Sequence, residues 1–283
     1  MSTIPTVEFT QALASLLFAT ILFFIAFISA YKAGYFKWPA FHPNPKIGLT
    51  ECFQLFLLFM TLQFIVFPLL LYWGFVQDIE KVKLDFELTG WLNLGAIYGM
   101  TFLLAIFFYF KRNQVHSLFA SASPLYDIGI GILSWLIAFP SALLISQVMV
   151  LILTHYLGYT LEDQSAVIHM KKSLEDPNLF MATLFAVVLV VPILEEMLFR
   201  GFLQSSIRNY LSPFSSILIS SILFSWFHFS FNQGMNNFNI LTSLFVLALF
   251  LGFLRERQGN LLPSIALHAT FNAISVAMIV LSS

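Results

Sequence analysis

This 283-residue chain contains about eight long apolar segments, and they indicate that it folds in a lipid bilayer and not in water. A helix needs about 20 apolar residues to cross the ~30 Å hydrocarbon core of a bilayer. The segments lie near residues 10–31, 50–75, 89–110, 126–157, 179–200, 213–231, 238–254 and 261–281. We therefore expect an all-α fold, a polytopic membrane helix bundle with about eight transmembrane helices.

The composition agrees with a membrane protein. Apolar residues make up 59% of the chain and charged residues only 10%, whereas soluble domains carry roughly 25% charge. The net charge of −1 excludes nucleic acid binding through a strong basic field. The single cysteine, Cys52, excludes an intrachain disulfide. We expect a multi-pass protein of the plasma (inner) membrane, with the lipid bilayer as a partner and no nucleic acid.

The positive charges predict an orientation. Loops after the odd-numbered segments hold nine lysines and arginines, and loops after the even-numbered segments hold four. The more basic loops are expected on the cytoplasmic side. We treat residues 1–283 as a single membrane domain, with motifs in the region 178–281 and helices of undefined role in 1–177. The longest polar connection, 158–178, is expected to be a mobile loop.

Two glutamates and an arginine interrupt the fifth apolar segment, in the stretch "VVPILEEMLFRGF". Glu196 and Arg200 are spaced i,i+4 with the acid first, which is the favourable order for a helical ion pair. Glu195 points about 100° away and has no partner in its own helix. An intramembrane carboxylate needs a partner elsewhere or a wet cavity, so Glu195 is a candidate functional residue. The alternative is that these charges only anchor a helix end.

Two later segments carry polar pairs at the same spacing. "ILFSWFHFSF" holds Phe224 and His228, and "LLPSIALHATFNA" holds His268 and Asn272. Taken singly, His228 could be an interfacial or core residue, and His268 with Asn272 could hold helices together by hydrogen bonds. If the fifth and sixth helices form an antiparallel hairpin, Glu195 and His228 lie at roughly the same depth.

These groups suit hydrolysis of an acyl bond by an activated water. A carboxylate beside a neutral imidazole can act as a general base, and N–H groups on a facing helix could stabilise an oxyanion. Neither the H-E-x-x-H pattern of a zinc helix nor the G-x-S-x-G pattern of a serine hydrolase occurs.

The stretches "EEMLFRGF", "FSWFH" and "HATFN" resemble the EExxxR, FxxxH and HxxxN motifs of the CPBP family. This family comprises the CAAX prenyl endopeptidases and the bacteriocin-processing and immunity proteins, also called Abi proteins. The resemblance covers about residues 190–272, in the same motif order. The first 175 residues carry no motif of this family.

The resemblance implies an intramembrane glutamic endopeptidase whose cavity opens toward the cytoplasm. In that family the first glutamate is the acid/base, here Glu195, and the histidine of the second motif, His228, holds the water with it. His268 and Asn272 would supply oxyanion donors, and Glu196 with Arg200 would be a supporting pair. The partner is a protein or peptide substrate at the membrane, lipidated or not.

Three alternatives stay open. Zinc could bind Glu195, His228 and His268, although we expect no cofactor because a glutamate and a histidine already activate water. The chain could be a non-enzymatic immunity or scaffold protein that binds a partner through the same fold. A transporter is disfavoured because no inverted repeat of broken helices is apparent.

Overall fold

The structure is a computed structural model that describes residues 4–38, 47–69, 86–160 and 164–282. Every regular element in this part of the chain is helical. The long α-helices are α1 (Ile4–Lys32), α2 (Leu49–Thr61), α4 (Phe86–Phe110), α6 (Pro124–Leu151), α11 (Pro213–Trp226), α12 (Asn236–Gln258) and α13 (Leu262–Leu281). The shorter ones are α5 (Arg112–Phe119), α7 (Ser165–Ser173), α8 (Pro177–Phe185), α9 (Val191–Glu196) and α10 (Ser205–Arg208). Four π-helical turns, η1 (Leu62–Val66), η3 (Ile152–Tyr156), η4 (Ala186–Val190) and η5 (Met197–Gln204), and the 3₁₀ turn η6 (Phe231–Gln233) complete the described elements.

The expected all-α membrane bundle is confirmed. Within the described residues, seven helical stretches are long and apolar enough to cross a bilayer. They are Phe9–Lys32, Leu49–Leu69, Gly90–Phe110, Pro124–Tyr156, Pro177–Arg208, Asn236–Gln258 and Leu262–Leu281. Each corresponds to one of the expected segments, although residues 70–75 of the second expected segment lie outside the described part.

The sixth expected segment, 213–231, differs from the expectation. Its helix α11 has only 14 residues, which is about 21 Å and short of the ~30 Å needed to span the hydrocarbon. After Trp226 the chain continues to α12 without a long helix, through the turn η6. Non-helical backbone at membrane depth is tolerated where it is buried in protein or lines a cavity, and this stretch does line one, through Ser230 and Gln233.

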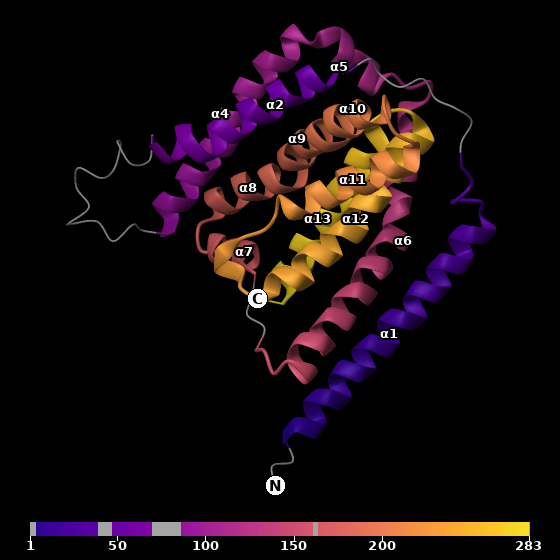
Figure 1. Ribbon diagram of the computed structural model, residues 1–283. Coiled ribbons are helices and arrows are strands. Elements are labelled where there is room, and N and C mark those ends of the chain that lie inside the picture. The colour runs from indigo at the N-terminus through magenta and orange to yellow at the C-terminus, as the bar shows by residue number, and fades with distance from the viewer. Residues whose placement is uncertain (1–3, 39–46, 70–85, 161–163, 283) are drawn as a thin grey trace.

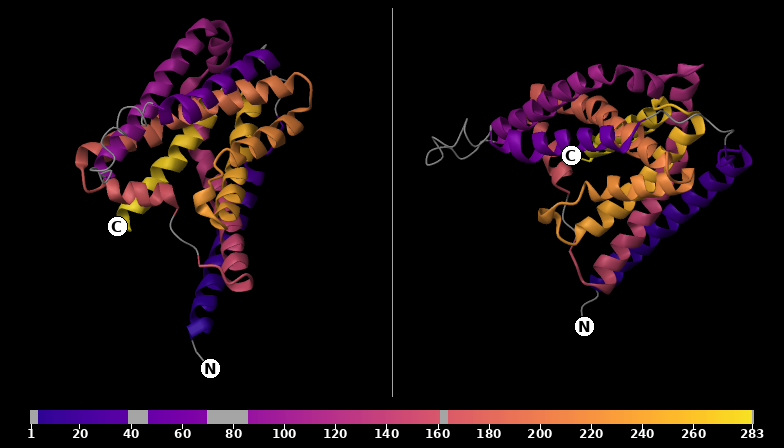
Figure 2. Two further views of the ribbon diagram at one scale, coloured as in Figure 1. Left: turned by 60° about the vertical axis from the view of Figure 1, so that its left-hand side comes forward. Right: turned by 45° about the horizontal axis from the view of Figure 1, so that its top comes forward.

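The helices are arranged around the run from α8 to α10. In both Figure 1 and Figure 2 this run lies between the pair α2 and α4 and the group α11 to α13. Helix α6 packs against α12 and α13 on one side and against α1 on the other, so α1 lies at the edge of the bundle (Figure 1). Helix α6 therefore separates the N-terminal helix from the helices that carry the three motifs.

The main apolar core surrounds η5. Leu198, Phe199 and Phe202 are fully buried there, and they pack with Leu55 of α2 and Leu104 of α4 in one cluster. This core fixes η5, which carries Arg200, between helices that are distant in sequence.

The expectation of a mobile loop over 158–178 does not fit the described part of that segment. Residues 161–163 lie outside the description, but Ser165–Ser173 forms helix α7. Met170 and Ser173 of α7 are buried, and the helix packs against α8, α13 and α4. The side chain of Ser165 also accepts a 2.6 Å hydrogen bond from Gln233.

Candidate active site in the membrane

The EExxxR motif begins at the end of the short helix α9, which holds Glu195 and Glu196, and continues into the π-helical turn η5, which holds Arg200. Helix α9 follows η4 and precedes η5, and π-helical turns inside α-helices often occur at functional sites. Pro192 lies in the first turn of α9 and has no backbone N–H to offer to the preceding turn. The Val187 carbonyl instead accepts a 2.9 Å hydrogen bond from Nδ2 of Asn272 on α13. The N–H that Pro192 lacks, just before the first motif, is thus replaced by the amide of the asparagine in the third motif.

Glu196 and Arg200 form the ion pair that their spacing predicted. Nη1 of Arg200 lies 3.0 Å from Oε1 of Glu196, and both side chains are fully buried. Nη2 of Arg200 donates to the Ala248 carbonyl of α12 at 3.2 Å. The guanidinium carbon lies 4.3 Å from the centroid of the Phe224 ring, within range of a cation–π interaction. These contacts join η5 to α11 and α12.

Phe224 positions His228 through its backbone. The Phe224 carbonyl lies 2.9 Å from Nδ1 of His228, and because a carbonyl only accepts, Nδ1 carries the hydrogen. Nε2 then faces Glu195, 3.7 Å from Oε1. The phenylalanine of the FxxxH pattern therefore has two roles: its buried ring receives Arg200, and its carbonyl orients the histidine.

His268 lies between the two glutamates. Its Nδ1 is 3.0 Å from Oε1 of Glu196, and its Nε2 is 3.7 Å from Oε2 of Glu195. The ring is almost completely buried, whereas the Glu195 side chain is 22% exposed. Glu195 is thus the carboxylate with access to solvent, and Glu196 is the one enclosed by protein.

The turn between α12 and α13 sets the depth of His268. Gly259 takes the left-handed conformation that ends α12, and the Leu261 N–H donates 2.9 Å to the Leu118 carbonyl at the end of α5. A Cβ on Gly131 of α6 would lie 2.3 Å from the Pro263 carbonyl oxygen, so only glycine permits this approach. These contacts draw the start of α13 into the bundle and bring His268 level with Glu195.

A cavity of about 460 Å³ opens beside these groups. Glu195, His228, His268 and Asn272 all line it, together with residues of α7 and α12. A neighbouring cavity of about 600 Å³ shares Phe271 and Ser275 among its lining residues. The space next to Glu195 is therefore large enough for a segment of extended polypeptide.

The structure brings all six sequence-predicted residues into one region. Glu195, His228, His268 and Asn272 line the cavity, whereas Glu196 and Arg200 are fully buried behind it. In the set proposed for zinc, each imidazole lies 3.7 Å from a different oxygen of Glu195. No group of three or more His, Cys, Asp or Glu side chains among residues 4–38, 47–69, 86–160 and 164–282 has an arrangement that could hold a metal ion.

Sequence reasoning missed Asn237, which organises the non-helical connection after His228. Its Oδ1 accepts from the Ser230 N–H at 3.1 Å, and its Nδ2 donates to the carbonyls of Ser230 at 2.7 Å and Gly234 at 3.0 Å. The side chain is buried. The only sequence signal is the polar stretch "NQGMNN" inside an apolar region, and it does not indicate which asparagine makes these bonds.

Fold and site together define a polytopic membrane protein with a carboxylate flanked by two imidazoles in an intramembrane cavity. Residues 177–274 match the family described as type II CAAX prenyl endopeptidase Rce1-like, and this stretch is a domain of that family. The matched segment contains all three motifs. No curated protein and no solved structure matches the chain.

Proposed function

We propose that the protein is an intramembrane endopeptidase that hydrolyses a peptide bond near the terminus of a membrane-associated or lipidated protein or peptide. The observation that carries the proposal is the placement of Glu195, whose two oxygens lie 3.7 Å from His228 and 3.7 Å from His268 at the edge of a cavity. Because these contacts are longer than a direct hydrogen bond, a water molecule beside each pair can hydrogen-bond to both groups. The family match supports peptidase chemistry.

In the proposed reaction, Glu195 is the general base and His228 holds the attacking water. The water oxygen bonds to the carbonyl carbon of the substrate while its proton passes to Glu195. Glu195 then returns this proton to the leaving nitrogen as the C–N bond breaks. The products are a new carboxyl terminus and a new amine, with no covalent intermediate and no metal ion.

His268 and Asn272 are proposed to stabilise the oxyanion. A doubly protonated His268 would donate from Nδ1 to Glu196 and from Nε2 to the oxyanion. The Asn272 amide has two N–H groups, and one of them donates to Val187. The other is the group that the oxyanion role requires. Glu196 and Arg200 act as the supporting pair that holds His268 in place.

The orientation expected from the charges and the expected cytoplasmic opening of the cavity are incompatible. Residues 164–167 and 230–233 contribute to the cavity lining, and they follow the fourth and sixth apolar segments, whose loops are the less basic ones. If the more basic loops are cytoplasmic, the cavity opens to the opposite side. We retain the orientation based on charge and propose a plasma (inner) membrane location.

The test is hydrolysis by purified protein in detergent, assayed on two synthetic peptides of one sequence, with and without a C-terminal prenyl group. New termini are identified by mass spectrometry. Glu195→Gln should abolish cleavage without lowering thermal stability. The control is Glu51→Gln, which removes a carboxylate that pairs with Lys111 at 3.8 Å, away from the cavity, and should cleave normally. Cleavage by folded Glu195→Gln protein would refute the proposal and favour a binding function for the fold.

A further inference from the structure

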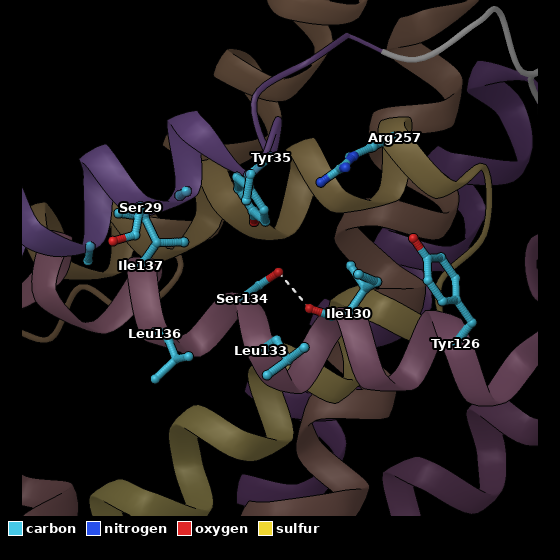
Figure 3. A pocket seen from close by; sticks show the side chains of 12 residues that line it. Ser29, Tyr35, Tyr126, Ile130, Leu133, Ser134, Leu136, Ile137 and Arg257 are labelled. Carbon is cyan, nitrogen blue, oxygen red and sulfur yellow. Dashed lines mark hydrogen bonds between the residues drawn. The ribbon is translucent and has the colours of Figure 1, made fainter.

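The cavity of about 600 Å³ beside the Glu195 cavity, here called the outer cavity, shares part of its wall with it. The common lining residues lie on α7, α12 and α13, among them Val167, Leu244 and Ser275. A further cavity of about 390 Å³ lies between α1 and α6 and shares no lining residue with either of them (Figure 3). Of these two, only the outer cavity can therefore hold part of a molecule that also reaches Glu195.

The outer cavity lies nearer to the end of the membrane spans than the Glu195 cavity does. On α12 the outer cavity begins at Asn239, close to the start of the helix, whereas the Glu195 cavity extends inward to Leu247. On α13 the outer cavity reaches Ser282, just past the end of the helix, whereas the Glu195 cavity begins at His268. A chain that runs along α12 from Asn239 to Leu247 therefore leads from the membrane boundary into the Glu195 cavity.

Two polar side chains in the wall of the outer cavity have unused hydrogen-bonding groups. Oδ1 of Asn239 and Oγ of Ser243 are buried and have no hydrogen-bond partner among the described residues. A serine in a helix can donate to a carbonyl of the preceding turn, as Ser134 does to Ile130 at 2.7 Å (Figure 3). Ser243 makes no such bond. Buried polar atoms nearly always have a partner, so these two oxygens indicate where a bound molecule supplies one.

The chemistry and spacing of these two groups fit a peptide backbone. Asn239 and Ser243 are four residues apart on α12, which is about 6 Å along the axis. Alternate residues of an extended peptide are about 6.4–6.8 Å apart, so two N–H groups on one edge of the peptide can reach both oxygens. Oδ1 of an asparagine only accepts, whereas a prenyl or acyl chain has no donor to offer. No Asp, Glu, Lys, Arg or His is among the described residues that line the outer cavity, and an unpaired charge would be costly there.

We propose that the outer cavity binds an extended, uncharged stretch of the polypeptide substrate on one side of the scissile bond. Two backbone N–H groups of this stretch donate to Oδ1 of Asn239 and Oγ of Ser243. The inference rests on the proposed function, which makes a peptide bond the target of Glu195. It assigns the outer cavity to the peptide backbone and not to a lipid chain, and it gives Asn239 and Ser243 a role in affinity.

The test measures binding of the unprenylated peptide of the cleavage assay, carrying a fluorophore, to full-length Glu195→Gln protein in detergent by fluorescence anisotropy. Asn239→Leu and Ser243→Ala, each added to Glu195→Gln, should weaken binding about two- to tenfold, the order of effect of one lost hydrogen bond. Neither should lower the thermal unfolding temperature, because each removes a buried oxygen that has no partner in the free protein.

Ser221→Ala is the matched control. Oγ of Ser221 is also buried without a partner among the described residues, but Ser221 lines none of the three cavities, so peptide binding should not change. Backbone N-methylation, scanned one residue at a time along the peptide, should weaken binding to Glu195→Gln at two positions that are two residues apart. Asn239→Leu should remove the effect at one of these positions, and Ser243→Ala at the other.

Absence of peptide binding, unchanged binding in both cavity variants, or an equal loss in Ser221→Ala would overturn the inference. A lower unfolding temperature in both cavity variants would also overturn it, because the two oxygens would then be structural. Tighter binding of the prenylated peptide to Asn239→Leu than to its parent would assign the outer cavity to the lipid chain instead. Cleavage by the wild type with unchanged binding in the cavity variants would refute this inference alone. The expected binding losses, with a wild type that cleaves neither peptide, would support the binding site and refute the proposed hydrolysis.

Discussion

Nδ1 of His268 lies 3.0 Å from Oε1 of Glu196, and the same oxygen lies 3.0 Å from Nη1 of Arg200. Glu196 therefore holds two partners at once, one on its own helix and one on α13. The contact with His268 turns Nε2 of the imidazole toward Glu195. This arrangement gives the enclosed glutamate a positioning role in addition to its ion pair.

The two roles of Glu196 can be separated by substitution. Glu196→Leu leaves Arg200 as an uncompensated buried charge, which should cost about 3–5 kcal/mol of stability. Replacing both members by apolar residues, as Glu196→Leu with Arg200→Met, should recover most of that loss. The double variant should remain poorly active, because His268 still lacks its acceptor. Thermal unfolding in detergent and kcat measure the two effects, and recovery of kcat together with stability would exclude the positioning role.

Metal chelation tests the proposed water activation by Glu195 and His228. Purified protein should contain zinc well below one equivalent and should keep its activity through prolonged dialysis against a chelator. The measurements are metal analysis and peptide cleavage before and after dialysis. A stoichiometric metal whose removal abolishes cleavage, and whose return restores it, would contradict the metal-free mechanism.

The hydrogen bonds of Asn237 predict that it positions His228 without touching substrate. Asn237→Ala removes three bonds to the connection that follows His228. A displacement of about 1 Å at a reacting group can cost 10²-fold in rate, so we expect kcat to fall by up to about that factor. Limited proteolysis should cut the connection near Ser230 faster than in the wild type.

Two further variants complete this test. Thr242→Ala, which removes a hydroxyl bonded only within α12, should behave as wild type. Asn237→Asp keeps the acceptor for the Ser230 N–H and should recover part of the activity. Normal kcat in a protein whose connection is readily cleaved would show that Asn237 matters for stability alone.

Local spacing predicted part of the site, and packing between distant segments decided the rest. The i,i+4 rule was enough for Glu196 and Arg200, and hairpin geometry suggested that Glu195 and His228 would meet. The contact of His268 with Glu196 depends on Gly131 against Pro263 and on Leu261 against Leu118. Such contacts join separate apolar segments and leave no periodic signal in the sequence.

The sixth expected segment shows the same limit for the fold. Hydropathy over 213–231 indicates a full span, but α11 ends at Trp226. The chain can leave the helix there because Asn237 satisfies the backbone groups of Ser230 and Gly234. A hydropathy scale measures only the apolar content of a segment. It does not predict that a helix ends early where a buried asparagine replaces the helical hydrogen bonds.

Cysteine labelling can decide which side of the membrane the cavity faces. The native Cys52 is buried, so a membrane-impermeant maleimide should give a low background. Leu211→Cys, in the exposed turn before α11, should react only from the cytoplasmic side. Phe231→Cys, in the connection near the cavity, should react from the opposite side. The reverse pattern would refute the charge-based orientation and give the cavity the cytoplasmic opening that the family resemblance implies.

Asn272 is the residue for which a structural role and a catalytic role most need to be separated. Its amide donates to the Val187 carbonyl, so Asn272→Ala alone should cost roughly 0.6 kcal/mol of stability, the average for such bonds in membrane helices. If one amide N–H also stabilises the oxyanion, kcat should fall about 10²–10³-fold, with little change in KM.

A second substitution distinguishes these two contributions. Pro192→Ala returns a backbone N–H to the turn that contains Val187, so the carbonyl can regain a partner within its own helix. We expect the double variant Asn272→Ala with Pro192→Ala to recover thermal stability but not kcat. Pro192→Ala alone should be close to wild type in both measurements, which makes it the control. If kcat recovers together with stability in the double variant, Asn272 only satisfies Val187, and the oxyanion must be stabilised by His268 without it.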